Sequence, residues 1–253
     1  MNFEDKLKKK FLYNKGKNPL KTLYFLLQKF KLKGLKKNLT VTGVDLLVER
    51  FFSNINIDKG IYIDIGCNHP FYNNNTFLLH QKGWSGINVD LDFHFIDMFN
   101  YFRPNDVNKQ IAISDKIGEQ EFFFYHNKSA INTLSSEIHN LRGRNAREIK
   151  KIKTDTLDNI IEHTIYANQK INFLTVDVEG YELNVLKGFN LKKYEPDMVI
   201  VEYIDSSIRQ EFYYQSISNI LNSDLFNFMK NNDFSFVNWL DSDLVFVNNK
   251  IRT

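Results

Sequence analysis

From residue 60 onward, short apolar runs alternate with stretches in which apolar residues recur at helical spacing. The runs are rich in β-branched and aromatic residues and end at glycine or at acidic residues, which is typical of buried strands. Such an alternation indicates an α/β domain with a mostly parallel sheet and helices on both faces. Strands are expected at 60–66, 86–91, 110–114, 121–125, 171–177 and 197–203, and helices at 76–82, 95–102, 155–163 and 181–187.

The last forty residues predict a different ending. Residues 217–231 have a helical pattern, and two alternating runs at 234–240 and 244–248 flank the turn at 241–243. These runs predict a closing antiparallel hairpin. The fold expected is therefore a Rossmann-like α/β domain with a mostly parallel seven-stranded sheet and a terminal antiparallel hairpin.

The middle of the chain is less regular. The strand at 121–125 is expected to form a hairpin with the residues before it, through a turn at Gly118. Residues 127–147 are polar and predict an irregular segment. Thr154 or Asp155 is expected to cap the helix that follows.

Residues 1–55 predict a basic helical extension in front of a domain at 56–253. Leucines from Leu20 to Leu27 fall at helical spacing after Pro19, and a second short helix is expected from Val44 to Phe51. Residues 1–38 hold 12 lysines against Glu4 and Asp5, a balance of +10; the whole chain is +3, so the remainder carries 3 − 10 = −7. A basic arm on an acidic body indicates a docking surface for an anionic membrane, an anionic substrate or a partner subunit. Packing on its own domain, formation of a homo-oligomer and peripheral membrane contact remain open for this arm.

The composition and the apolar pattern bear on the cellular location of the protein. No run of 18 apolar residues predicts a transmembrane helix, and the N-terminus lacks the pattern of a signal peptide. The single cysteine, Cys67, excludes an internal disulfide and is expected in the core. A cytoplasmic location is therefore expected.

Carboxylates follow nearly every expected strand, where ligands of open parallel sheets bind. They are expected to line one polar cleft, because unpaired carboxylates are costly in a core. Gly66 allows a tight turn close to a ligand, and Asp90 follows it at the distance typical of an acid that binds a ribose diol. No glycine-rich pyrophosphate loop is present. These residues point to an adenosine-type cofactor, and they leave both a methyltransferase and a generic nucleotide-binding fold open.

Several segments resemble the FkbM-type methyltransferases in order and spacing. They include YIDIGCNHP from Tyr62, KTDTLDNII from Lys153, DMVIVE from Asp197 and, most specifically, INFLTVDVEGYELNVLKGF from Ile171. The resemblance covers about residues 58 to 204, with a weaker continuation to 248. It implies a class I methyltransferase that uses S-adenosylmethionine, in a family of which many members methylate oxygen atoms of sugars. The sequence departs from the family at Asp90-Leu91, where Glu-Pro is usual, and at Asn74, where Ser is common.

The resemblance also implies roles for individual residues. Asp64, Gly66 and Asn68 would border the methionine end of the cofactor, and Asp90 would hold its ribose. Asp177 would lie near the transferable methyl group. Beside the adenine, the family pattern places Ser114 and Asp115.

A sugar hydroxyl must lose its proton as the methyl group arrives, so a base or a metal ion is expected at the acceptor. Asp177 and Glu202 end neighbouring strands and offer hard oxygen ligands for Mg²⁺, Mn²⁺ or Ca²⁺, with Glu179 as a third. Asp177, Glu179 and His69 are the candidate catalytic residues. The competing interpretations are that Glu179 stabilises a helix N-terminus, that Glu202 is a structural acceptor and that His69 is a structural loop residue.

Three arginines, Arg142, Arg144 and Arg147, are candidates for binding the phosphates of a nucleotide-linked sugar, although they also suit a solvated loop. The function expected is an O-methyltransferase for a sugar hydroxyl, of a nucleotide-linked sugar or a glycan, in surface-polysaccharide biosynthesis. The alternatives are a methyltransferase for another small molecule with an oxygen or nitrogen acceptor, and an inactive nucleotide-binding scaffold. Nucleic acid is not an expected partner, since the body is acidic and a motif for holding a flipped base is missing.

Overall fold

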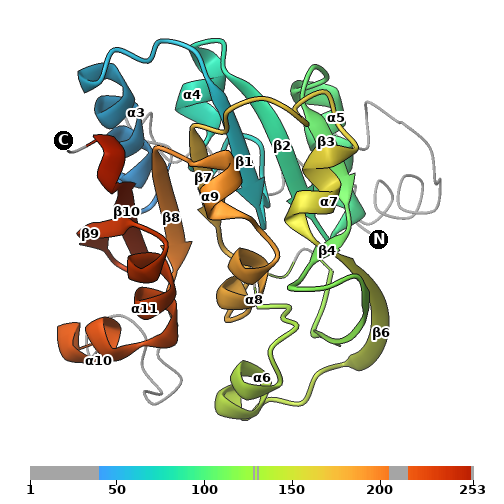
Figure 1. Cartoon of the computed structure of the whole chain (residues 1–253). Helices are drawn as coiled ribbons and strands as arrows, with labels where there is room; N and C mark the ends of the chain where they lie inside the picture. The colour runs from blue at the N-terminus through green and yellow to red at the C-terminus, as the bar shows by residue number, and fades with distance from the viewer. Residues whose placement is uncertain (1–39, 128, 130, 205–215, 252–253) are drawn as a thin grey trace.

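The computed structural model describes residues 40–127, 129, 131–204 and 216–251 (Figure 1). The helix expected after Pro19 lies outside these residues. Within them, seven strands form the main sheet in the order β3-β2-β1-β7-β8-β10-β9. Their bounds are β1 Ile61–Ile65, β2 Ser85–Asp90, β3 Val107–Gln110, β7 Phe173–Val176, β8 Met198–Glu202, β9 Phe234–Leu240 and β10 Asp243–Asn248.

The strands β3, β2, β1, β7 and β8 are parallel, and β10 runs antiparallel to both β8 and β9. The predicted mostly parallel seven-stranded sheet with a terminal antiparallel hairpin is confirmed. The central strands β1 and β7 are buried on both faces, which explains why they are mostly apolar in the sequence. Counted along the chain, the strands of this sheet are ordered 3-2-1-4-5-7-6, in agreement with the Rossmann-like fold predicted from the sequence.

Helices cover both faces of the sheet. Ile63 and Ile65 of β1 pack into a core that includes residues of α7, α8 and α11, whereas Tyr62, on the other face, packs with α3. Val48 and Phe52 of α3 belong to this second core and contact the sheet. The part of the predicted extension at 1–55 that the structure describes is therefore packed on the domain. The helices are α3 Val44–Asn54, α4 Phe77–Gln81, α5 Phe93–Phe102, α7 Leu157–Glu162, α8 Glu182–Lys187, α9 Leu191–Tyr194, α10 Ile217–Asn222 and α11 Asp224–Asn231, with a 3₁₀ turn at Asn249–Ile251.

A smaller sheet in the described part of the chain differs from the prediction. Its strands are β4 Ala112–Ile113, β5 Gly118–Phe124 and β6 Glu148–Asp155, in the order β4-β6-β5. The expected hairpin of the strand at 121–125 with the residues before it is wrong, because β5 pairs antiparallel with β6. The strand expected at 110–114 divides after Gln110 into β3 of the main sheet and β4 of the small one. In Figure 1 the small sheet lies below the β3 edge of the main sheet.

Local boundaries also differ. The segment 127–147, predicted as irregular, contains α6 Ser136–Arg142, which the Ser135 hydroxyl caps. Thr156, not Thr154 or Asp155, caps α7. The helix predicted at 217–231 divides at Ser223, whose hydroxyl accepts from the backbone N–H of Phe226 and starts α11. No helix among the described residues is long and apolar enough to cross a membrane.

Candidate functional site

A cavity of about 870 Å³ opens at the carboxyl ends of the parallel strands. Residues that follow four neighbouring strands line it: Gly66 after β1, Asp90 at the end of β2, Asp177 after β7, and Glu202 at the end of β8. The small sheet contributes Phe122 and other residues to the opposite wall. The cavity therefore occupies the position that the topology predicts for a ligand.

The loop after β1 passes very close to β7. Gly66 has φ +78°, and a Cβ there would lie 1.7 Å from the carbonyl oxygen of Asp177. The N–H groups of Gly66 and Cys67 both donate to the carbonyl oxygen of Val89, at 2.9 and 3.1 Å. Only glycine fits this position, and the loop is held against both β2 and β7 at the cavity wall.

Asp90 is tied to the same loop through its carboxylate. Its Oδ2 accepts from the N–H of Asn68 at 3.0 Å, and its Oδ1 accepts from the N–H of Asp92 at 2.8 Å. Each oxygen retains a second lone pair, so the carboxylate can also accept from ligand hydroxyls. Burial raises the pKa of Asp90 to about 7, although these two hydrogen bonds oppose the rise.

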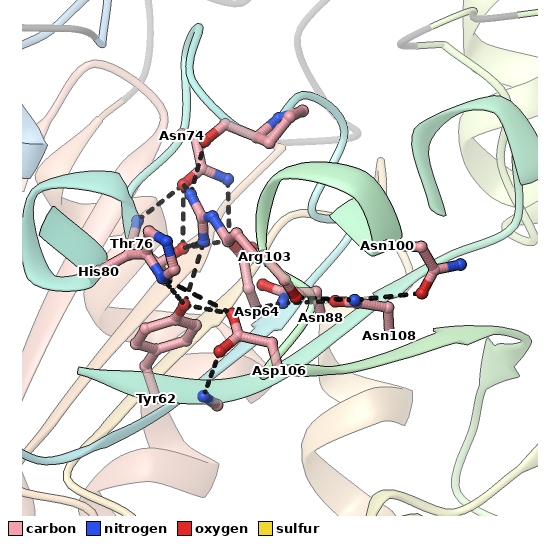
Figure 2. Close-up of polar contacts among 12 residues, drawn as sticks. Tyr62, Asp64, Asn74, Thr76, His80, Asn88, Asn100, Arg103, Asp106 and Asn108 are labelled. Carbon is pink, nitrogen blue, oxygen red and sulfur yellow. Dashed lines mark hydrogen bonds and ion pairs between the residues drawn. The ribbon is translucent and has the colours of Figure 1, made fainter. Parts of the chain in front are cut away.

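Asp64 does not line the cavity, although the resemblance places it at the methionine end. It is buried beneath the loop, where its Oδ2 accepts from Asn74 Nδ2 at 2.9 Å and from Thr76 Oγ1 at 2.8 Å (Figure 2). Burial raises the pKa of Asp64 to about 6, and the nearby Arg103 charge limits the rise. Asp64 therefore supports the loop from below.

The candidate base His69 lies in the loop after β1. Its ring is buried, and Nδ1 accepts from the N–H groups of Phe71 and Tyr72 at 3.1 and 3.0 Å. These bonds occupy the nitrogen that a base would use, and His69 is not among the residues that line the cavity. The role of His69 as general base stays a prediction, and its position outside the cavity lining favours the structural alternative.

Three carboxylates that line the cavity lie close together. Asp177, Glu179 and Glu202 each offer an oxygen, and these oxygens lie within 4.8 Å of one another. The accessible surface of Asp177 faces the cavity. Burial raises the pKa values of all three groups, that of Glu179 to about 8, and the Asp177 charge adds to the rise at Glu179 and Glu202. The candidate metal ligands predicted from the sequence are thus brought together.

The hairpin turn adds a fourth carboxylate. Asp243, at the start of β10, pairs across the sheet with Glu202 and also lines the cavity. Burial, together with the Asp177 charge, raises the pKa of Asp243 to about 7. Sequence reasoning placed Asp243 only in a turn; the signal that could have found it is that a closing hairpin next to β8 brings its turn to the same sheet edge.

The turn between β7 and α8 is shaped by Glu182, which the sequence analysis did not single out. Its Oε1 accepts from the N–H groups of Val178 and Gly180, at 3.0 and 2.9 Å. Glu182 is also the acidic residue in the first turn of α8, at the helix start where the alternative interpretation placed Glu179. Glu179 itself has φ +61° and faces the cavity, with its backbone oxygen accepting from Thr133 Oγ1 at 2.7 Å.

The three arginines are dispersed. Arg142 donates to the Ile131 carbonyl oxygen at 2.6 Å and forms an ion pair with Glu179, so it orients that carboxylate. Arg144 and Arg147 are exposed and do not line the cavity. The arrangement does not support the hypothesis of a shared phosphate site; the basic side chains that line the cavity among the described residues are Lys150 and Lys153 of β6.

Ser114 and Asp115 are the residues expected beside an adenine. Ser114 is buried and bonds to Asp115 at 3.0 Å and to the Tyr181 hydroxyl at 3.2 Å, and Asp115 is exposed. Neither lines the cavity, so the expected adenine contacts of Ser114 and Asp115 are not supported. The residues just before them, together with the start of α5, form an apolar section of the wall: Phe93, Phe95, Ile111, Ala112 and Ile113.

Comparison with known families matches residues 64–236 to the methyltransferase FkbM domain. The chain belongs to the FkbM methyltransferase family. The FkbM domain contains the three clustered carboxylates, whereas Thr40–Thr42 and Asp241–Asp243, which also line the cavity, lie outside the match.

Among solved structures, the chain is similar to the one titled crystal structure of monomeric WbdD, with 11% identity and a TM-score of 0.39. The alignment covers 81% of this chain, and the chain spans 40% of the length of that structure. Curated protein sequences give no match.

Proposed function

We propose that this FkbM-family protein is an S-adenosylmethionine-dependent O-methyltransferase. Its acceptor is a sugar hydroxyl, of a nucleotide-linked sugar or a glycan, in cytoplasmic steps of surface-polysaccharide biosynthesis. One observation carries the proposal: the diol-binding carboxylate Asp90 and the cluster around Asp177 line the same cavity. A nucleoside held at one end would thus present its reactive group to the carboxylates at the other.

The residues present fit the cofactor. The turn at Gly66 lets backbone approach the ligand closely, Asp90 offers acceptors for two ribose hydroxyls, and the apolar section around Phe93 and Ile113 suits a purine ring. When bound, S-adenosylmethionine supplies an electrophilic methyl group on a sulfonium. A cavity of about 870 Å³ leaves room for an acceptor beside it.

The carboxylates then act on the acceptor. A raised pKa makes the ionised form of Asp177 a stronger base, able to accept a proton from the hydroxyl as its oxygen attacks. Arg142 holds Glu179 in place, and the strand pairing keeps Glu202 beside Asp177. Alignment of the hydroxyl with the transferable group would supply much of the acceleration.

We include a divalent cation, Mg²⁺, Mn²⁺ or Ca²⁺, held by Asp177, Glu202 and Glu179. Three oxygens of opposite charge to the cation within 4.8 Å suit such an ion, and like charges this close oppose joint ionisation without one. Treatment with a chelator is expected to lower turnover at least about 100-fold. Affinity for S-adenosylmethionine, measured by calorimetry, should change little, and adding back one of the three ions should restore turnover. Full turnover in chelator would exclude the cation.

The ionisation of Asp90 predicts a pH dependence of nucleoside binding. With a folded pKa of about 7, the group is mostly protonated at pH 6 and mostly ionised at pH 8. The carboxylate is the better acceptor, so affinity rises as pH rises, and the Kd should be about tenfold weaker at pH 6 than at pH 8. The ligand 5′-methylthioadenosine isolates this effect because it lacks the amino acid group. Asp90→Asn should bind it weakly at both pH values; an unchanged pH profile in this variant would show that another group titrates.

The deciding experiment is a search for methyl transfer. Purified protein, S-adenosylmethionine and Mg²⁺ are incubated with a panel of nucleotide sugars and free glycans, and products are examined by mass spectrometry for a gain of one methyl group. Transfer to a sugar hydroxyl is the expected result. Binding of the cofactor without transfer to any acceptor would favour the inactive scaffold instead.

A nitrogen acceptor is the second candidate. Asp241 and Asp243 also line the cavity, and a protonated amino group would suit this charge without a metal ion. Its nitrogen would pass a proton to one of the carboxylates before its lone pair attacks the methyl group. Amino sugars therefore belong in the acceptor panel. Methylation of an amine that persists in chelator would favour this candidate over the metal-assisted O-methyltransferase.

A further inference from the structure

Arg103, at the C-terminal end of α5, is fully buried. Its guanidinium lies at the centre of the polar network in Figure 2. Nη1 donates to Thr76 Oγ1 at 2.7 Å and to the Tyr62 hydroxyl at 3.3 Å. Nη2 donates to the Pro70 carbonyl oxygen at 2.6 Å and to Asn74 Oδ1 at 2.8 Å. These acceptors are all neutral oxygens, and three of them belong to the loop after β1.

Two of these acceptors, Asn74 and Thr76, connect Arg103 to the residues beneath the cavity wall. Because Asn74 Oδ1 faces Arg103, its Nδ2 points the other way and donates to Asp64 at 2.9 Å and to the Cys67 carbonyl oxygen at 3.2 Å. Thr76 accepts from Arg103 and donates to Asp64 at 2.8 Å. A single guanidinium thus fixes the orientation of two side chains that anchor both ends of the loop.

This loop carries the residues that face the ligand. Gly66, Asn68, Asn73 and Asn75 line the cavity, and Asn68 is the residue whose N–H reaches Asp90. Arg103 itself does not line the cavity. Arg103 is also held from outside the loop, because its chain enters from α5 and Phe99 of that helix packs beneath the guanidinium, 4.8 Å from the ring centre.

A second branch of the network fixes the arginine to the sheet. The Tyr62 hydroxyl donates to Asp106 Oδ2 at 2.5 Å, and Asp106 also accepts from the Gly86 N–H at 3.2 Å and from Asn88 at 3.0 Å. Tyr62 lies on β1, and Gly86 and Asn88 lie on β2. The guanidinium therefore joins the rigid strands on one side to the ligand-binding loop on the other.

We propose that Arg103 is a positioning residue for the methyl donor, acting through Asn74 and Thr76 to hold the loop from Gly66 to Thr76 in its ligand-binding form. The inference rests on the proposed function for the identity of the donor. The arginine touches neither donor nor acceptor, so it governs affinity for the cofactor and not the transfer step.

Loss of the positive charge has a further consequence at Asp64. The Arg103 charge lowers the pKa of Asp64, which burial otherwise raises. In Arg103→Gln the pKa of Asp64 should rise above about 6, so near neutral pH the carboxyl becomes protonated and accepts less well from Asn74 and Thr76. Weaker cofactor binding in Arg103→Gln should therefore be more severe at pH 6.5 than at pH 8.5, beyond the pH dependence of the wild type.

The experiment compares Arg103→Lys, Arg103→Gln, Asn74→Ala and the double variant Arg103→Lys/Asn74→Ala, with Arg50→Lys on the exposed surface of α3 as the matched control. Calorimetry with S-adenosylmethionine gives the Kd, and thermal unfolding gives the unfolding temperature of each variant. Turnover is measured at saturating cofactor. We expect a Kd at least tenfold weaker in the Arg103 variants, with kcat within about threefold and the control unchanged. In the Asn74→Ala background, Arg103→Lys should weaken binding by less than it does in the wild type, because one of its two side-chain routes to the loop is already broken.

A reduced unfolding temperature with an unchanged Kd in folded Arg103→Lys would overturn the inference, since it would leave Arg103 a purely structural role. Additive losses in the double variant would also overturn it, because Arg103 would then not act through Asn74. If Arg103→Gln fails to fold, Arg103→Lys and the double variant decide. Failure of the wild-type protein to bind S-adenosylmethionine is a separate result, which would contradict the proposed function.

Discussion

Replacing Gly66 with alanine is expected to cost more than about 3 kcal/mol of folding free energy and to abolish cofactor binding. The added Cβ would lie 1.7 Å from the carbonyl oxygen of Asp177, and backbone cannot yield as a flexible side chain can. A residue with a Cβ at φ +78° costs a further 1–2 kcal/mol, roughly. For a domain of this size the midpoint of thermal unfolding should fall by about 6–12 °C.

Gly118→Ala is the matched control, because a Cβ there meets nothing within 4 Å. It should unfold within about 2 °C of the wild type and bind the cofactor normally. Thermal unfolding and calorimetry on the two variants separate the steric effect at Gly66 from the general effect of losing a glycine. Wild-type stability and affinity in Gly66→Ala would mean that the loop does not pass against β7 as described.

The main sheet could be predicted because its strands are simple patterns. The strands β1, β7 and β8 are buried on both faces, so the sequence is mostly apolar at those positions, with Asp64, Thr175 and Glu202 as the exceptions. The helix α3 was predicted from its apolar stripe, but the stripe alone could not say what it packs against. The contact of Phe52 with Trp84 and Phe173 joins residues far apart in the chain.

The small sheet could not be predicted in the same way. The strand β6 contains three lysines and is exposed along much of its length, so it lacks the apolar run by which a buried strand is recognised. Its partner β4 has only two residues, and its other partner β5 begins thirty residues earlier in the chain. Because the pairing depends on these distant contacts, propensity placed β5 in the wrong hairpin.

The candidate site was also predicted only in part. Residues at the ends of parallel strands share one edge of the sheet, so topology alone predicted that Asp90, Asp177 and Glu202 would meet at one cavity. Side-chain direction is not contained in that rule. The side chain of Asp64 points beneath the loop, and Arg103 at the C-terminal end of α5 supports the loop through Asn74. Local hydrogen bonding and packing decide where each of these side chains points.

Asp177→Asn is expected to lower kcat by about a thousandfold while the cofactor Kd changes less than about threefold. The amide is nearly isosteric but cannot accept the proton of the acceptor hydroxyl, and loss of a positioned base costs about 10²–10⁴ in rate. The amide is also a poorer ligand than a carboxylate for the proposed cation. Turnover by mass spectrometry, calorimetry with S-adenosylmethionine and titration of Mg²⁺ measure the three effects separately.

The matched control is Asp224→Asn, at an exposed position in the first turn of α11, which removes one negative charge far from the cavity lining. Its kcat should equal that of the wild type. The Asp177→Asn variant also distinguishes the two proposed roles of Asp177, as base and as metal ligand. If the carboxylate acts chiefly as a metal ligand, raised Mg²⁺ concentration should restore much of the lost rate, whereas loss of the base is insensitive to metal concentration. A kcat within threefold of the wild type would remove Asp177 from the reaction and leave the acidic cluster without a catalytic role.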